Sequence, residues 1–202
     1  MPKAKKRTTP EKYGLDPLPK PAIRPYPSNY VWTSIIKNGT QVTIRPIRSE
    51  DEPLMVKFHQ SLSDRSVYLR YFGSLSLSTR VAPERLARIC FGDYDREMVL
   101  VAEPTDPGTG DRRIIAVGRM NKLRDGNEAE VALLVSDPYQ KFGLGYELLR
   151  RVVEIARAEK LSRLSAEILP DNLAMQVIMK RLGFRVRLSK DLGSVRAVLD
   201  LL

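Results

Sequence analysis

Two glycines separated by one residue stand directly ahead of an amphipathic run, at Gly143 and Gly145 in the stretch QKFGLG. Glycine lets consecutive backbone N–H groups converge on a ligand because it has no side chain to obstruct the approach. A helix that begins there adds the partial positive charge of its N-terminus, so a phosphate or pyrophosphate is the expected ligand. The stretch matches neither a Walker loop nor a G-x-G-x-x-G dinucleotide fingerprint. A plain turn at the start of a helix is the alternative interpretation.

Metal and disulfide chemistry is not expected. The chain has one cysteine, Cys90, and one histidine, His59, too few for an intrachain disulfide or a cluster of metal ligands. Cys90 could be a nucleophile, but its place in RLARICFG indicates the buried face of a short helix. His59 is expected to serve in packing or to lie at the surface.

The glycine loop must be held between a strand and a helix, and the hydrophobic periodicity predicts both. We expect the strand over residues 128–135 and the helix over 145–160, whose apolar face carries Leu148, Val152 and Ile155. Other helices are predicted at 83–90, at 172–182 and from Ser49. In the helix from Ser49, Ser49 is the expected N-cap and Glu52 completes a capping box. Other strands are predicted at 41–48, 98–102, 114–120, 163–169, 185–188 and 195–199. This order predicts an α/β domain with a mixed, mostly antiparallel sheet flanked by helices and a central strand–loop–helix crossover.

The first 28 residues differ in composition from the rest. They hold seven basic side chains against two acidic ones, and seven of the 14 prolines. Such a segment buries too little apolar surface to offset the entropy of ordering, so we expect residues 1–28 to form a flexible tail and residues 29–202 to form one domain. The tail could bind an acidic partner or serve only for solubility. The formal net charge of +10 invites a nucleic-acid interpretation, but no basic helix or aromatic platform indicates specific recognition of bases.

No segment is predicted to cross a membrane. The longest strand-like apolar stretch, 131–135, is far shorter than the run of about 20 residues that a spanning helix needs. The start MPKAKKRTTP has the charge of a signal peptide, but no apolar segment follows it. We therefore expect a cytoplasmic protein with no membrane partner.

The loop resembles that of a known family. QKFGLG is similar to the Q/R-x-x-G-x-G/A loop that holds the coenzyme A pyrophosphate in GNAT N-acetyltransferases, and PDNLAMQVIMKRLGF follows where that family has an Asn-containing helix. The blocks RPYPSNY, TIRPIRSEDEPL, LSDRSVYLRYFG, DYDREMVLVAE and EAEVALLVSDPYQKFGLG are similar to the acetyltransferase domain of bacterial protein lysine acetyltransferases. Together they cover residues 24–188.

The resemblance implies the GNAT fold and an acetyl-CoA-dependent transfer to the ε-amine of protein lysines. In that family the domain is often fused to an acyl-CoA synthetase-like domain and acts on acetyl-CoA synthetase, so that enzyme or another acyl-CoA synthetase is a possible partner. We expect no synthetase-like or regulatory domain within the 202 residues. A small amine as the acceptor, or a non-catalytic domain that senses acyl-CoA, are the alternatives.

The resemblance also assigns the residues that bind acetyl-CoA. A backbone N–H near Leu134 or Val135 would polarise the thioester carbonyl. Asn172 would bond the pantetheine arm and cap the last helix. The full expected set is Leu133, Leu134, Val135, Gln140, Lys141, Phe142, Gly143, Leu144, Gly145, Tyr146, Asn172 and Met175, with no metal.

Glu130 occupies the position of the family's catalytic glutamate. A lysine amine has a pKa of about 10.4 and needs a base before it attacks a thioester. We expect burial in EVALLV to raise the pKa of Glu130 toward a useful range, with a water carrying the proton. Glu128, on the same strand, and Glu167, on the next strand, are competing bases. Met179 stands where many relatives have a tyrosine acid, but a thiolate can leave without one because a thiol has a pKa of about 8.5.

Three residues are weaker predictions for the acceptor side. Asp93 and Asp95 in GDYDRE could attract a substrate lysine, although an Asx-turn is equally expected. Tyr68, with Arg70 and Tyr71, could line the acceptor side, although aromatic residues at this spacing are more often core.

Overall fold

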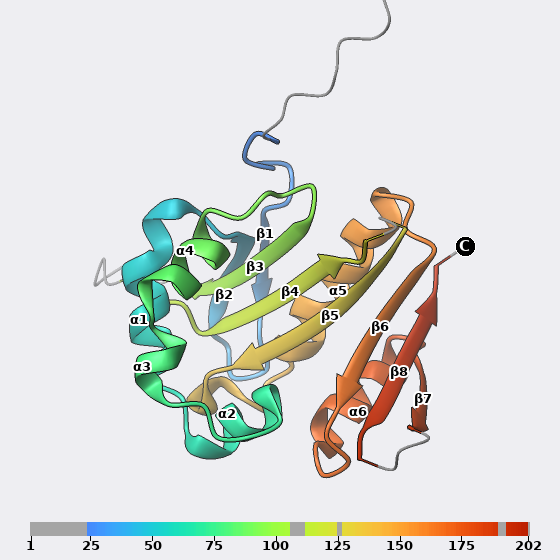
Figure 1. Ribbon diagram of the computed structural model, residues 1–202. Helices are drawn as coiled ribbons and strands as arrows, with labels where there is room; N and C mark the ends of the chain where they lie inside the picture. The colour runs from blue at the N-terminus through green and yellow to red at the C-terminus, as the bar shows by residue number, and fades with distance from the viewer. Residues whose placement is uncertain (1–23, 106–111, 125–126, 190–192, 202) are drawn as a thin grey trace, which may run out of the picture.

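The computed structural model describes residues 24–105, 112–124, 127–189 and 193–201. Within these residues, eight strands form one sheet in the order β1-β2-β3-β4-β5-β6-β8-β7 (Figure 1). The strands are β1 (Trp32–Ile35), β2 (Gln41–Pro46), β3 (Glu97–Pro104), β4 (Ala116–Lys122), β5 (Glu128–Val135), β6 (Arg163–Ile168), β7 (Arg185–Leu188) and β8 (Val195–Asp200). The α-helices are α1 (Glu52–Gln60), α2 (Asp64–Tyr71), α3 (Leu77–Arg80), α4 (Pro83–Cys90), α5 (Leu144–Ala158) and α6 (Leu173–Arg181). Two 3-10 turns, η1 (Ser49–Asp51) and η2 (Asp137–Tyr139), precede α1 and the glycine loop.

The helices cover both faces of the sheet. Helices α5 and α6 pack on one face, and α1 to α4 lie on the other (Figure 1). Strand β3 is buried on both faces, because Leu100 belongs to the α5 core while Val99 and Val101 belong to the α1–α4 core. Burying each such side chain fully contributes about 1.5–3 kcal/mol. The predicted α/β class, with its mostly antiparallel sheet flanked by helices, is confirmed.

The strands β5 and β6 form the one parallel pair in the described sheet, and their pairing is short. The register runs from Glu128 opposite Arg163 to Glu130 opposite Ser165. On its other edge, β5 stays paired with β4 as far as Val135. The two parallel strands separate toward the end of the sheet where α2 and α6 lie (Figure 1). The second half of β5 is therefore left without β6 along one edge.

The elements around the glycine loop lie close to where the periodicity predicts them. Strand β5 has the predicted bounds, and α5 begins one residue before the predicted helix. Helix α4 also has its predicted bounds, and Cys90 is buried there as expected. Long apolar runs and glycine boundaries are local signals, so they predict these elements well.

The start of the first helix was predicted wrongly. Ser49 is not an N-cap, since residues 49–51 form η1 and α1 begins at Glu52. The carboxylate that closes the turn belongs to Asp51, whose Oδ2 accepts the backbone N–H of Arg48 at 2.8 Å. The predicted strand 114–120 is β4 at 116–122. Strand β1 and helix α2 were not predicted, because WTSI and DRSVYLRY lack a strong apolar period.

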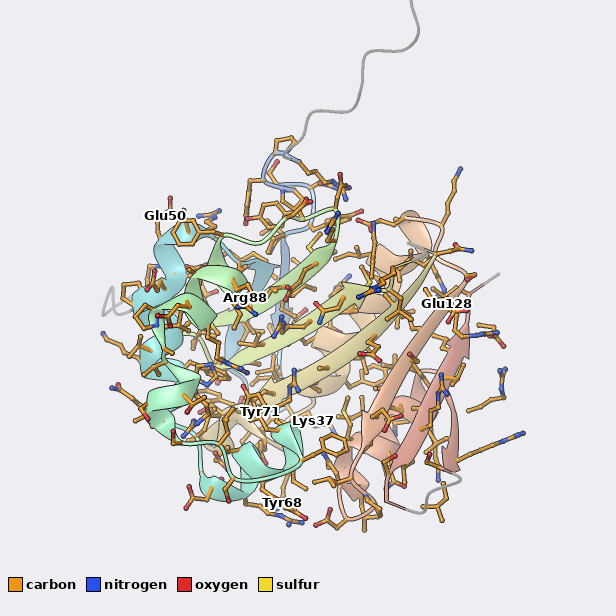
Figure 2. All side chains as sticks on the ribbon, viewed as in Figure 1. Lys37, Glu50, Tyr68, Tyr71, Arg88 and Glu128 are labelled. Carbon is orange, nitrogen blue, oxygen red and sulfur yellow. The ribbon has the colours of Figure 1, made fainter. Side chains whose placement is uncertain are left out.

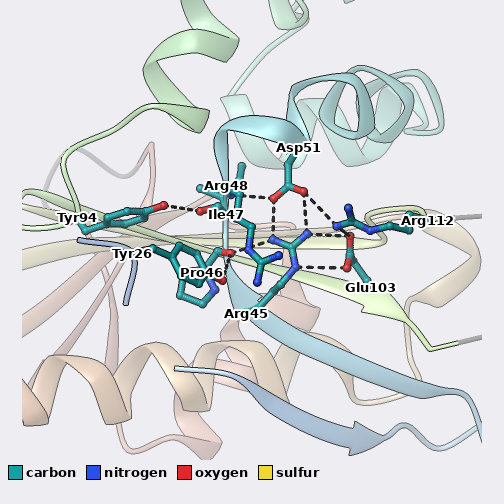
Figure 3. A network of polar contacts seen from close by, with 9 residues as sticks. All are labelled: Tyr26, Arg45, Pro46, Ile47, Arg48, Asp51, Tyr94, Glu103 and Arg112. Carbon is teal, nitrogen blue, oxygen red and sulfur yellow. Dashed lines mark hydrogen bonds and ion pairs between the residues drawn. The ribbon is translucent and has the colours of Figure 1, made fainter. Parts of the chain in front are cut away.

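A buried ion network joins β2 to η1 (Figure 3). Arg45 donates to both carboxylate oxygens of Asp51, at 2.7 and 2.8 Å, and to Glu103 Oε1 at 2.8 Å. Arg45 is 3% exposed and Asp51 is fully buried. Arg112 adds a second contact to Glu103, at 2.8 Å. The network therefore ties the start of the first helix to the sheet through one ion pair, Arg45–Asp51, that water hardly reaches.

The last residues of the predicted tail contact the domain. Arg24 forms an ion pair with Glu159 at 2.8 Å, and the hydroxyl of Tyr26 donates to the carbonyl of Pro46 at 3.2 Å. Residues 1–23, which make up most of that tail, lie outside the described residues. In the part of the chain that is described, no helix is long and apolar enough to cross a bilayer.

Candidate active site

A cleft of about 470 Å³ lies where β5 leaves β6. Its walls come from the second half of β5, the glycine loop with the start of α5, helix α6, and one side of α2. The lining residues include Leu133, Leu134, Val135, Gln140, Lys141, Gly143, Gly145, Tyr146, Asn172 and Met175. Ten of the twelve predicted cofactor residues therefore gather in one place.

The two glycines of the loop are required for different reasons. Gly143 is the N-cap of α5 and has φ +89°, a left-handed conformation that side chains disfavour. Gly145 lies inside the first turn, where a Cβ would come within 3.0 Å of Leu133 Cδ2 and 3.2 Å of Ile178 Cδ1. The first glycine therefore permits the turn, and the second lets α5 approach β5 and α6 closely. Together they leave the positive end of a 15-residue helix facing the cleft.

Helix α2 is fastened to the loop by hydrogen bonds. The side chain of Gln140 donates to the carbonyl of Val135 at 3.0 Å and to the hydroxyl of Ser66 at 2.9 Å. Asp137 accepts the backbone N–H of Ser63 at 2.9 Å and the hydroxyl of Ser66 at 2.9 Å. Burial acts to raise the pKa of Asp137, but the hydrogen bonds from Ser63 and Ser66 outweigh it and hold the pKa below its usual range. The side-chain amide of Gln140 therefore links the loop to α2 and to the end of β5.

Lys37 is a cleft residue that the sequence did not reveal. It lies in the β1–β2 hairpin, where its backbone N–H donates to the carbonyl of Phe142 at 3.0 Å. Its side chain passes 3.9 Å from the point where a Cβ of Gly143 would lie. Helix α2 adds three further cleft residues that were not predicted to bind the cofactor, Ser66, Leu69 and Arg70. The only sequence signal for Lys37 is the KNG turn, which predicts a hairpin and not a binding site.

Two predicted cofactor side chains lie elsewhere. Leu144 is 1% exposed in the α5 core, because the first turn of α5 directs it inward. Phe142 lies on the far side of the loop, beside a second cavity of about 380 Å³ that Lys37 also lines. Asn172 caps α6 as predicted, with its Oδ1 accepting the N–H of Met175 at 3.2 Å.

Glu130 is exposed, so the expectation that EVALLV buries this side chain is wrong. It lies at the last register pair between β5 and β6, directly before the strands separate. Glu128 pairs with Arg163 at 3.0 Å, and Glu167 accepts the hydroxyl of Ser194 at 2.9 Å. Of the three carboxylates, Glu130 alone has no hydrogen bond or ion pair among the described residues.

The weaker acceptor-side predictions do not reach the cleft. Asp93 accepts the backbone N–H of Asp95 at 2.9 Å, which is the Asx-turn alternative, and Asp95 pairs with Arg24 at 3.4 Å. Tyr68 is 38% exposed on α2 and lies under the guanidinium of Arg65, whose Cζ is 5.6 Å from the ring centroid. None of the three lines the cleft, whereas Arg70 does.

Two further side chains are buried and cannot contact a substrate. Met179 is fully buried in the α5 core. Burial raises the pKa of the Cys90 thiol to about 12, with Asp51 and Glu52 adding to the effect, so the thiol stays protonated at neutral pH. Across the described ranges, no group of three or more His, Cys, Asp or Glu side chains could hold a metal ion.

The chain is similar in sequence and in fold to known acetyltransferases. The family profile described as "Acetyltransferase (GNAT) domain" matches residues 41–185. An acetyltransferase of Pseudomonas aeruginosa is 27% identical over 153 residues, which are 76% of this chain and 80% of that protein. The acetyltransferase Pat of Mycolicibacterium smegmatis is 30% identical over 165 residues, which are 82% of this chain but only 47% of Pat. The crystal structure of the GNAT domain of S. lividans PAT superimposes with a TM-score of 0.77 at 29% identity, covering 88% of this chain and 100% of that domain.

Proposed function

Because the chain belongs to the GNAT acetyltransferase family, we propose that it transfers the acetyl group of acetyl-CoA to the ε-amine of protein lysines. The observation that carries the proposal is the cleft where β5 leaves β6, with the N-terminus of α5 at its wall. Acetyl-CoA has a pyrophosphate and, at its other end, a thioester. The pyrophosphate fits the positive N-terminus of α5, and the thioester can then extend into the cleft along β5. An acyl-CoA synthetase is the protein acceptor that the sequence resemblance favours.

Binding of acetyl-CoA is assigned to the loop and the free edge of β5. The backbone N–H groups between Lys141 and Gly145 hold the pyrophosphate, and the ammonium of Lys37 adds positive charge beside them. The pantetheine arm replaces β6 along the edge of β5 and reaches Asn172. A backbone N–H near Leu134 or Val135 donates to the thioester carbonyl and stabilises the charge that develops on its oxygen.

The chemical step is direct attack by the amine. Glu130 takes a proton from the lysine ammonium through a water molecule, since its carboxylate is unpaired and lies where the strands part. The amine nitrogen then bonds to the carbonyl carbon, the C–S bond breaks, and the sulfur leaves as a thiolate. The nitrogen gives up its second proton to water or to the departing thiolate, which leaves the neutral amide and coenzyme A. No tyrosine acid is required, because a thiol has a pKa of about 8.5. This assigns the buried Met179 to packing alone.

The acceptor class is tested by transfer assays with intact mass analysis. The wild-type chain is incubated with acetyl-CoA and lysine peptides, with an acyl-CoA synthetase, and with a panel of small amines. A mass increase of one acetyl group on the peptides or the protein is the expected result. Transfer to small amines alone would contradict the proposed acceptor, and binding of acetyl-CoA without any transfer would contradict the proposed activity.

The loop assignment predicts the effect of Gly143→Asp. The new carboxylate lies where the pyrophosphate is bound, and like charges at about 4 Å repel by about 4 kcal/mol near a protein surface before screening. We expect the affinity for acetyl-CoA, measured by calorimetry, to fall by about tenfold or more.

The matched control is Gly39→Asp. Gly39 has φ +85° in the exposed β1–β2 turn, so this variant carries the same backbone strain and the same charge outside the cleft. It should bind acetyl-CoA as the wild type does. Equal affinities for the two folded variants would remove the basis for placing the pyrophosphate at the loop.

A further inference from the structure

Two arginines stack on one tyrosine ring beside the cleft. The guanidinium carbons of Arg70, on α2, and Arg85, on α4, lie 5.1 and 5.2 Å from the centroid of the Tyr71 ring. Figure 2 labels Tyr71, the last residue of α2, and Arg88 on α4. Neither arginine has an ion pair or a hydrogen bond to a carboxylate among the described residues. Arg119, which is close to Arg70, is by contrast paired with Glu97.

Arg70 lies at the junction of two spaces. It lines the main cleft, and it also lines a recess of about 20 Å³ together with His59, Arg119, Ala132 and others. Ala132 is the cross-strand partner of Arg119 and lies two residues after Glu130, so both residues of β5 project from the same face. Arg70 therefore borders the cleft on the face of β5 that carries Glu130, and Arg85, which lines neither space, contacts the same Tyr71 ring.

A buried histidine in the recess also lacks a partner. His59 is 2% exposed, and neither ring nitrogen has a hydrogen-bond partner in the described part of the chain. Burial, with the charges of Arg80, Arg85 and Arg70, lowers the pKa of His59 to about 4. The ring is therefore neutral at pH 7 and offers one donor and one acceptor to whatever enters the recess.

Arg70 and Arg85 lack a carboxylate partner among the described residues, so positive charge accumulates around them. Burial lowers the pKa of Arg70, and the charges of Arg119 and Arg85 act in the same direction. A lysine ammonium that approaches this region is repelled by the two unpaired guanidinium groups. An anion bound beside Arg70 relieves the repulsion and can accept paired hydrogen bonds from its planar guanidinium group.

We propose that Arg70, with the charge of Arg85 behind it, binds a carboxylate of the acceptor, located next to the amine that receives the acetyl group. The inference rests on the proposed transfer to an amine and names its substrate class. In a protein acceptor the carboxylate belongs to an Asp or Glu beside the lysine, and in a small acceptor it is the α-carboxylate of an amino acid.

The test uses two pairs of acceptors. One pair is a lysine peptide with Glu beside the lysine and the same peptide with Gln there, and the other is free lysine and lysinamide. Because a hydrogen bond to a charged group is stronger than a neutral one, the wild type should show about a tenfold or greater preference in kcat/KM for the Glu peptide. Arg70→Gln should remove most of this preference and Arg85→Gln part of it, with the KM for acetyl-CoA unchanged in both variants. Arg88→Gln, an exposed charge on the same helix as Arg85, should retain it.

The outcomes test the carboxylate site separately from the proposed acetyl transfer. Equal kcat/KM within both acceptor pairs, the two peptides and the two free amines, would overturn the carboxylate site while the transfer itself stands. A raised KM for acetyl-CoA in Arg70→Gln, with the Glu preference intact, would overturn it as well and place Arg70 at the cosubstrate. Discrimination between free lysine and lysinamide, without discrimination between the peptides, would support the α-carboxylate as the source. Transfer to none of the four acceptors would contradict the proposed function.

Discussion

Replacing Glu130 by glutamine is expected to lower turnover with a lysine peptide by about 10²- to 10⁴-fold at neutral pH. Glutamine keeps the shape of the side chain but cannot accept the proton of the ammonium. The affinity for acetyl-CoA should stay close to that of the wild type, since Glu130 does not line the cleft. The defect should shrink as the pH rises toward the amine's own pKa of about 10.4, because free amine then forms without a base. Steady-state kinetics from neutral to alkaline pH, with calorimetry for acetyl-CoA, measure both effects.

The controls are Glu128→Gln and Glu167→Gln, because these carboxylates are already engaged by Arg163 and Ser194. Both variants should turn over near the wild-type rate. A severe loss in one of them, with near-normal turnover in Glu130→Gln, would move the base to that carboxylate. Near-normal turnover in all three would mean that solvent removes the proton.

Asp51→Ala is expected to cost about 3–5 kcal/mol of unfolding free energy, because it leaves the buried guanidinium of Arg45 without its main partner. Glu103 remains, but it contacts Arg45 from one side only. The first helix also loses the carboxylate that accepts the N–H of Arg48. Urea denaturation followed by circular dichroism measures the loss. The control Glu154→Gln removes a carboxylate from a solvent-accessible helix pair and should cost less than about 1 kcal/mol.

The same network makes stability depend on pH. Burial acts to raise the pKa of Asp51, but hydrogen bonds from Arg45 and Arg48 outweigh it, so the folded-state pKa lies below the usual value. A depressed carboxyl pKa contributes stability that is present above the unfolded-state pKa of about 3.9 and is lost as the pH falls through the folded-state value. The difference in stability between the wild type and Asp51→Ala should therefore narrow below about pH 4. A constant difference down to pH 2 would show that the charge of Asp51 contributes nothing and that only its packing does.

The sequence alone determined the central part of the protein. The apolar strand 128–135, the glycines at 143 and 145 and the amphipathic run after them are adjacent in the chain, so β5, the loop and α5 could be predicted with nearly correct bounds. The same stretch carried the family resemblance and most of the predicted cofactor residues. Local backbone preference and periodicity are properties of neighbouring residues, which is why they can be read without a structure.

The position of helix α2 could not be predicted from local sequence patterns. Its residues are mostly polar, and it is positioned by Asp137, which is 71 residues from Ser66 along the chain. Lys37 reaches the cleft only because the β1–β2 hairpin packs against the carbonyl of Phe142. Such contacts depend on the packing of distant segments, and no local pattern encodes them.

Only the tertiary structure decided the surroundings of Glu130 and the arginine pair. EVALLV predicts a buried carboxylate, yet Glu130 is exposed although it still pairs with Ser165 of β6. Arg70 and Arg85 come from different helices and meet at Tyr71 because α2 and α4 pack on the same face of the sheet. The burial and net charge of a site are sums over groups that are remote in sequence, so they emerge only when the chain has folded.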